Sequence, residues 1–290
     1  MSADVALDSR ELARRIELGD ARGAEDSIRA QVSLRPDCGA TVASLAGGLA
    51  VYGGVGSPLS RARALGMSGP VSDGELDRVE EFYRSFGLPT RFELCPYADP
   101  TLVAATARRG YRLTGFINVF VRALGDRDPS EQGPERDALP LHGAHADADV
   151  RPGSVRVRRI DKREGAAWAR LVGQGFGESE PSAMTIDLGL AQLDREHVAC
   201  FQAEIEGLPV AGGVLSVDDG IAFLFAGSTL AGQRGRGAQT ALIAARVAYA
   251  RDIGCRLVSV AASAGSSSQR NIERAGFRLS YTRASLELTI

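Results

Sequence analysis

The sequence lacks three features that would assign a class quickly: an excess of basic charge, a long apolar run and closely spaced cysteines. Its 34 Lys and Arg residues are balanced by 36 Asp and Glu residues, and a net charge of -2 gives no broad basic face for nucleic acid. No run approaches the roughly 18 apolar residues of a membrane span. The N-terminus has no apolar segment behind a basic start. We therefore expect a cytoplasmic protein with neither a nucleic-acid nor a membrane partner.

Metal-binding and disulfide patterns are also missing. The cysteines stand far apart, at Cys38, Cys95, Cys200 and Cys255. No C-x-x-C pair or histidine lies at ligand spacing beside them, so we expect free, buried thiols. His142 and His145 form an H-x-x-H pattern without a rigid helix or further ligands. We expect no metal.

The organisation along the chain is two similar halves joined by a linker. Residues 126–153 are rich in Pro, Gly, Asp, Glu and Ala and show no apolar period, which predicts a linker. On each side the chain repeats the order helix, strand, helix, long strand, and the words RRGYRL and ERAGFRL correspond. The first half repeats this order over residues 73–124 and the second over residues 239–290. We predict an α+β (α/β) fold of two units, each with a mixed, mostly antiparallel sheet flanked by helices.

The first half is the less complete copy. We expect two short helices before Cys38, few strands, and a helix that begins near Ser72 or Asp73, either of which makes a good N-cap. Ahead of that helix there is no arginine and glycine loop. This half keeps the fold and lacks the loop described next.

The loop GQRGRGAQTAL, residues 232–242, lies between the last strand of an antiparallel meander and a helix. Glycine lets an anion approach the backbone, and the first amides of a helix are unpaired donors at its positive end. A P-loop needs a lysine that is absent here. A dinucleotide fingerprint needs a third glycine and a later acidic residue, which are also absent. The helix that follows would pack on the sheet through Leu242, Ala245, Tyr249 and Ile253.

The remaining pattern, R-x-x-G-x-G/A, resembles the pyrophosphate motif of the GCN5-related N-acetyltransferases, the GNAT superfamily. The match runs through Gly237, and Gln239 stands where the family has Gly or Ala. The resemblance covers about residues 155–290, and weakly residues 38–124. It implies a tandem GNAT protein: a degenerate GNAT-like domain at 1–125, the linker at 126–153, and an acetyl-CoA-binding GNAT domain at 154–290. The two copies would pack as an intramolecular pseudo-dimer.

The resemblance also implies a set of acetyl-CoA contacts. The end of the strand before the loop would lie along the pantetheine arm, and a backbone amide there would face the thioester carbonyl. The tyrosine and asparagine that the family often places on and before its last helix fall here at Ile272 and near Gly265, so we expect Ser268 or Asn271 to contact the cofactor instead. The implied cofactor-binding residues are Ala226, Gly227, Ser228, Thr229, Leu230, Arg234, Gly235, Arg236, Gly237, Ala238, Gln239, Thr240, Ser268 and Asn271.

The acid and base are less defined than the cofactor contacts. An amine must lose a proton before it attacks, so a carboxylate or an ordered water should face the acceptor. Glu178 and Glu180 lie where GNAT proteins place acceptor-binding residues, and the choice between a base at Glu178 and a solvated loop carboxylate stays open. Glu204 and Glu206 are alternatives. Tyr281 is the candidate acid, and its other interpretation is a half-buried strand tyrosine.

Two main functions follow from these expectations, and acyl transfer to a hydroxyl or from a longer acyl donor is a third possibility. The first is transfer of an acetyl group from acetyl-CoA to a primary amine of a small molecule, by direct attack and without a covalent enzyme intermediate. The second is a non-catalytic acyl-CoA-binding or regulatory module. The sequence identifies neither the acceptor nor the oligomeric state.

Overall fold

The computed structural model describes residues 8–125 and 154–289. The predicted linker at 126–153, with His142 and His145, lies outside the described residues. The chain divides into two compact units. Of the described residues, unit 1 comprises 8–120, 261–270 and 278–289, and unit 2 comprises 121–125, 154–260 and 271–277.

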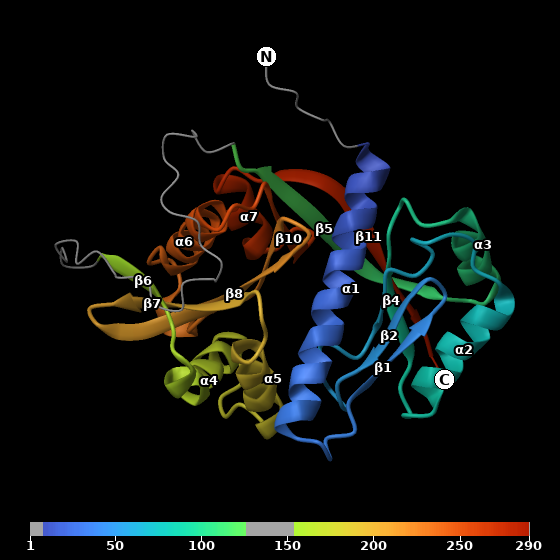
Figure 1. Cartoon of the computed structure of the whole chain (residues 1–290), viewed down its shortest axis with the longest axis horizontal. Helices are drawn as coiled ribbons and strands as arrows, with labels where there is room; N and C mark the ends of the chain where they lie inside the picture. Colours follow the sequence, from blue (N-terminus) through green and yellow to red (C-terminus); the bar gives the residue numbers. More distant parts are fainter. Residues whose placement is uncertain (1–7, 126–153, 290) are drawn as a thin grey trace. The chain divides into compact units, whose positions relative to one another are not determined.

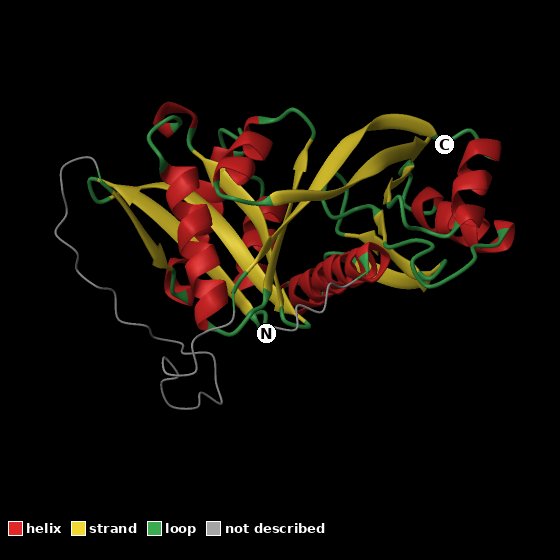
Figure 2. Cartoon of the chain, turned by 90° about the horizontal axis from the view of Figure 1, so that it is seen from above, coloured by secondary structure: helices red, strands yellow, loops and turns green. Residues whose placement is uncertain are grey.

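Unit 1 contains strands in the order β1-β2-β3-β4-β11-β5. Its elements are α1 (Ser9–Leu34), β1 (Thr41–Leu45), β2 (Gly48–Tyr52), β3 (Ala62–Arg63), α2 (Asp73–Arg84), β4 (Thr90–Leu94), α3 (Pro100–Arg108), most of β5 (Arg112–Ala123) and β11 (Arg278–Leu288). Within this unit α1 lies on one side of β1 and β2, and α2 and α3 lie on the other (Figures 1 and 2). The predicted helix and strand order from residue 73 to residue 124 is confirmed.

Local sequence explains the helix starts in unit 1. Ser72 caps α2: its side chain accepts from the amide of Glu75, whose carboxylate in turn accepts from the amide of Ser72 at 2.8 Å. Asp99 caps α3 ahead of Pro100. The expectation of two short helices before Cys38 was wrong, because α1 is one helix of 26 residues. Its buried face, which includes Ala13, Ile16 and Ile28, packs on the strands and outweighs the low helix propensity of its glycines.

The C-terminal strand β11 belongs to unit 1. β11 pairs antiparallel with β4, in a register from Ala284↔Leu94 to Leu288↔Thr90. Hydrophobic pattern shows that residues 278–288 form a strand, but pairing between distant segments is not encoded locally. The sequence therefore predicted the element correctly without its partner.

Unit 2 contains strands in the order β10-β9-β8-β7-β6, antiparallel except for the parallel pair β9 and β10. Its elements are β6 (Val155–Arg159), α4 (Gly165–Gly175), α5 (Ala183–Leu193), β7 (Val198–Ile205), β8 (Leu208–Asp218), β9 (Ile221–Thr229), α6 (Ala238–Asp252), the first part of β10 (Leu257–Ser263) and the second part of α7 (Ser267–Arg274). The mixed, mostly antiparallel sheet with flanking helices confirms the predicted α+β class.

The sheet of unit 2 is covered on both faces: α4 and α5 lie on one, and α6 lies on the other (Figure 1). Two adjacent glycines of β8 show this. A Cβ at Gly212 would lie 2.6 Å from Val172 of α4, whereas a Cβ at Gly213 would lie 2.8 Å from Arg246 of α6. Because successive strand residues face opposite sides, each helix approaches the backbone where a glycine faces it.

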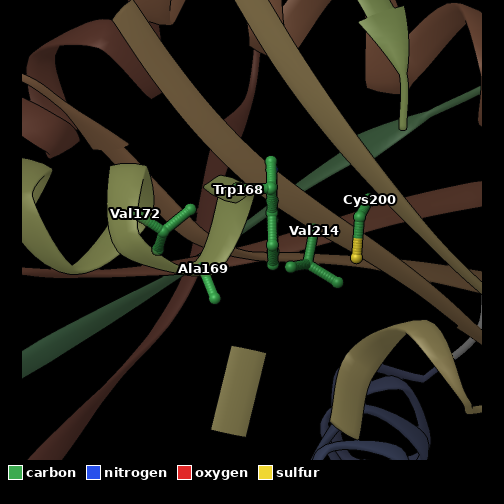
Figure 3. Close-up of a cluster of buried hydrophobic side chains, with 5 residues drawn as sticks. All are labelled: Trp168, Ala169, Val172, Cys200 and Val214. Atoms are coloured by element: carbon green, nitrogen blue, oxygen red, sulfur yellow. The ribbon is translucent and has the colours of Figure 1, made fainter. Parts of the chain in front are cut away.

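The core under α4 is built around Trp168, which packs with Ala169, Val172, Cys200 and Val214 (Figure 3). Its indole Nε1 donates to the carbonyl of Phe201 at 2.9 Å, which satisfies the one polar atom of the side chain.

The four cysteines are free in the structure, and three of them are buried. Burial raises the pKa of the Cys95 and Cys200 thiols to about 12 and that of Cys255 to about 11. We therefore expect iodoacetamide at pH 8 to label only Cys38 in the folded protein, because the thiolate is the nucleophile. Mass spectrometry should show one adduct before denaturation and four in urea. Labelling of Cys200 as fast as Cys38 would contradict this.

Within the described ranges, no helix is both long and apolar enough to cross a bilayer. The same residues contain no cluster of three or more His, Cys, Asp or Glu side chains that could hold a metal ion.

Candidate functional site

The strand before the glycine loop is bulged. Gly212 pairs with Ser228 and Val214 pairs with Phe225, so two residues of β9, Ala226 and Gly227, face one residue of β8. Ala226 has a φ of 50°, a left-handed conformation that is unusual outside glycine. The parallel pairing of β9 with β10 ends at Leu224↔Val260, before the bulge. The edge of β9 from the bulge onward is thus outside this ladder, and the predicted contacts of this edge with the pantetheine arm stay a prediction.

The glycine loop then leads into α6. Gly235 and Gly237 have φ values of 78° and 85°, which explains why glycine is used at both positions. Gly237 is the N-cap of α6 and supplies no side chain to it. The first helical bond runs from the amide of Ala241 to the carbonyl of Gly237 at 3.0 Å. In the described part of the chain, the amides of residues 235–240 have no acceptor.

Side chains fix the loop to its surroundings. Arg234 donates from Nε to the carbonyl of Thr229 at 3.3 Å and from Nη2 to that of Gly175 at 3.2 Å. Gln239 donates from Nε2 to Oγ1 of Thr229 at 2.9 Å. The larger side chain at this position folds back onto β9, and α6 begins regularly with its first amides uncapped. Ser228 is buried and donates from Oγ to the carbonyl of Val172 at 2.9 Å.

The loop therefore presents a set of amides without acceptors at the positive end of a 15-residue helix, next to a bulged strand edge. Arg236 adds charge nearby, with Nη1 bonded to Oε1 of Gln233 at 2.6 Å. The arrangement can hold an anion such as a phosphate by main-chain hydrogen bonds.

Known structures share this architecture. An N-acetyltransferase from Kribbella flavida, described as GCN5-related, is 17% identical, with a TM-score of 0.60 over 92% of this chain and 94% of its own. A tandem GNAT protein from the clavulanic acid biosynthesis pathway is 14% identical, with a TM-score of 0.56 over 99% and 96%. A GCN5-related N-acetyltransferase from Sphaerobacter thermophilus is 17% identical, with a TM-score of 0.54 over 74% and 66%. No family model and no curated protein matches the sequence.

The protein has the tandem GNAT fold. This confirms the predicted architecture. The bulge and the loop lie in unit 2, within residues 226–240, where the resemblance implied most of the cofactor contacts.

Glu178 follows α4 of the GNAT fold and contacts the start of α5. Its carboxylate accepts from the amide of Ser182 at 3.1 Å and from Oγ1 of Thr185 at 2.9 Å. It therefore helps to cap α5, which is a structural task that the sequence did not indicate. Among the other candidates, Glu204 is bound to Nε of Arg158 at 2.7 Å, Glu180 is exposed, and Glu206 is an exposed turn residue with a φ of 55°.

Tyr281 lies in unit 1, on β11, whereas the glycine loop belongs to unit 2. Its hydroxyl is buried and donates to Oε1 of Glu17 at 2.7 Å. Burial, followed by the charge of Glu17, raises the pKa of Tyr281 far above its usual range. The hydroxyl thus donates a buried hydrogen bond, and the proposed function assigns Tyr281 no catalytic role.

The two predicted cofactor contacts on α7, Ser268 and Asn271, are accessible to different extents. Ser268 is exposed in the part of α7 that belongs to unit 1. Asn271 is half-buried in unit 2, and its Oδ1 accepts from Nη1 of Arg274 at 3.2 Å. Their contacts with a cofactor stay predictions.

Sequence reasoning missed Arg246. The predicted core face of α6 was partly wrong, because the buried residues include Leu242, Arg246 and Ala250, while Ala245 and Tyr249 are only half-buried. The sequence spacing does indicate that Arg246 is buried, because it lies four residues after Leu242 and four before Ala250, on one side of the helix.

Proposed function

We propose that the protein is an acetyl-CoA-dependent N-acetyltransferase that acts on a primary amine of a small molecule. The observation that carries this proposal is the row of unpaired amides at residues 235–240, directly after a bulged strand whose parallel pairing has ended. Two proteins that share the fold are themselves described as GCN5-related N-acetyltransferases.

In this proposal the pyrophosphate and the pantetheine arm of acetyl-CoA bind to unit 2. The pyrophosphate binds the amides of the loop and the start of α6, with Arg236 adding charge. The pantetheine arm follows the free edge of β9 from Ala226 to Leu230. Arg234, Gln239 and Ser228 hold these segments in place through the contacts described above, so their role is to position the backbone.

The reaction needs no covalent enzyme intermediate. The lone pair of the neutral amine forms a C–N bond with the thioester carbon, and the π electrons of the carbonyl move to its oxygen. Collapse of this intermediate restores the carbonyl, breaks the C–S bond and releases the CoA thiolate, while the nitrogen gives its proton to water or a carboxylate. An amide donor at the bulge would stabilise the oxyanion, a contribution of about 3 kcal/mol in other enzymes.

Glu178→Gln tests the proton acceptor. Because the carboxylate already accepts two hydrogen bonds from α5, we expect kcat to fall less than about tenfold, with Glu180→Gln as the control in the same loop. A fall of about 10²–10⁴ in kcat with unchanged melting temperature would instead identify Glu178 as the general base.

Turnover tests the function itself. The full-length protein is mixed with acetyl-CoA and a panel of amines that includes aminosugars, polyamines and amino acid amides, and free thiol is measured with a chromogenic disulfide. Thiol release that depends on one amine class supports the transferase. Binding of acetyl-CoA without thiol release would favour the alternative, a non-catalytic acyl-CoA-binding or regulatory module, and absence of binding would defeat both.

A further inference from the structure

Arg246 is an arginine in the apolar interior of unit 2. Its side chain is only 3% exposed, and no carboxylate in the described residues pairs with it. Nε donates to the carbonyl of Leu242 at 3.1 Å, and Nη1 donates to the carbonyls of Val214 at 3.1 Å and Phe225 at 3.3 Å. Burial lowers the pKa of Arg246 to about 10, which leaves it a cation at neutral pH.

The guanidinium lies against the bulge of β9. Val214 and Phe225 are the last regular pair before the bulge, and Nη1 bonds both of their carbonyls. A Cβ at Gly213 would lie 2.8 Å from Nη1, so the glycine makes room for the guanidinium. A Cβ at Gly227 would lie 3.5 Å from Nη2, and Gly227 is exposed.

Nη2 is thus the end of the guanidinium nearest the exposed strand edge. It donates to no acceptor within the described ranges, whereas Nε and Nη1 are bonded to backbone carbonyls. A buried cation is costly unless it is paired, and an uncharged side chain would fill this place at lower cost. Three carbonyl dipoles offset part of the cost and leave the net charge in place.

We propose that Arg246 is a positioning residue for the acyl group, whose uncompensated positive charge beneath Ala226 and Gly227 polarises the thioester carbonyl. This inference rests on the proposed function. The oxygen of that carbonyl gains negative charge as the amine adds, and a cation in a poorly solvated interior acts on it with little screening. The charge is fixed before the reaction, because Val214 and Phe225 hold the guanidinium in one orientation.

The test uses the full-length protein with Arg246→Met, which removes the charge, and Arg246→Lys, which keeps it on a shorter side chain. Arg251→Met is the control, an exposed arginine on the same helix. The infrared carbonyl band of bound acetyl-CoA, isotopically labelled at that carbon, is compared between variants, together with CoA affinity by calorimetry and kcat with the best amine.

We expect Arg246→Met to lose most of the carbonyl red shift and about 10²-fold in kcat, with CoA affinity within about threefold of wild type. Arg246→Lys should lie between the two, and Arg251→Met should match wild type. If Arg246→Met does not fold, a fall in kcat and in red shift for Arg246→Lys, at unchanged CoA affinity, carries the same conclusion.

An unchanged carbonyl band and kcat in the folded variants would overturn the inference while leaving the proposed function intact. Parallel loss of CoA affinity and red shift would also overturn it, because Arg246 would then only maintain the bulge. Failure of the wild-type protein to bind acetyl-CoA would remove the proposed function, and this inference with it.

Discussion

Arg234→Glu combined with Gly237→Glu is expected to lower acetyl-CoA affinity by at least about 10²-fold, because each change opposes anion binding. Glutamate at 237 must adopt a φ of 85°, which costs a non-glycine residue about 1–2 kcal/mol and disturbs the start of α6. It also places a negative charge at the positive end of the helix. Glutamate at 234 loses the two bonds to the carbonyls of Thr229 and Gly175 that hold the loop.

Calorimetric titration with acetyl-CoA measures this effect. The matched control is Arg251→Glu with Gly254→Glu, at the other end of α6, where Gly254 has a φ of 84°. This control makes the same change in charge and a similar demand on the backbone. Equal affinities for the loop variant and wild type would mean that residues 234–240 are not the pyrophosphate site, and the transferase proposal would lose its main support.

Arg283→Met is expected to destabilise unit 1 by about 3–5 kcal/mol, since it leaves a buried carboxylate without its partner. The Nε of Arg283 lies 2.7 Å from Oε1 of Glu17, and the two side chains are 5% and 4% exposed. Asp20 and Glu93 lie near the same guanidinium, with contacts to Nη1 of 3.6 and 3.7 Å. Replacing Arg283 therefore removes the cation shared by three carboxylates.

Urea denaturation followed by far-ultraviolet circular dichroism measures the loss. Arg91→Met is the control: Arg91 of β4 bonds Glu287 of β11 at 2.6 Å but is 55% exposed, so its loss should cost about 0–1 kcal/mol. A change in Arg283→Met no larger than this control would contradict the prediction.

The loss of unfolding free energy caused by Arg283→Met should also depend on pH. Burial raises the pKa of Glu17 above its usual range even beside Arg283. A carboxyl whose pKa is raised on folding lowers stability as pH increases above its unfolded value, because the folded state then favours the protonated form. The charge of Arg283 lowers the pKa of Glu17, so this pKa rises further in Arg283→Met, and the loss of stability relative to wild type should be larger at pH 8 than at pH 5. A loss of stability that grows on acidification would contradict this assignment.

Features that depend on neighbouring residues could be predicted from the amino-acid sequence. The capping box of Ser72 and Glu75, the proline after Asp99, and the glycines at 235 and 237 each fix a local backbone conformation. The helix start predicted near Ser72 is found there. The repeated order of helices and strands was also readable, because hydrophobic periodicity reports each element separately. These features were enough to predict the α+β class and the internal repeat, whereas the tandem GNAT architecture was implied by the resemblance of the loop at residues 234–239 to the GNAT pyrophosphate motif.

The tertiary structure decided what depends on contacts between distant segments. β11 pairs with β4 across nearly 200 residues of sequence, and the hydroxyl of Tyr281 donates to Glu17 on α1. The bulge at Ala226 and the burial of Arg246 beneath it depend on how α6 lies on β8 and β9. Such pairings arise from the free energy of packing the whole chain, in which a residue's neighbours in space, not in sequence, set its burial and its charge environment.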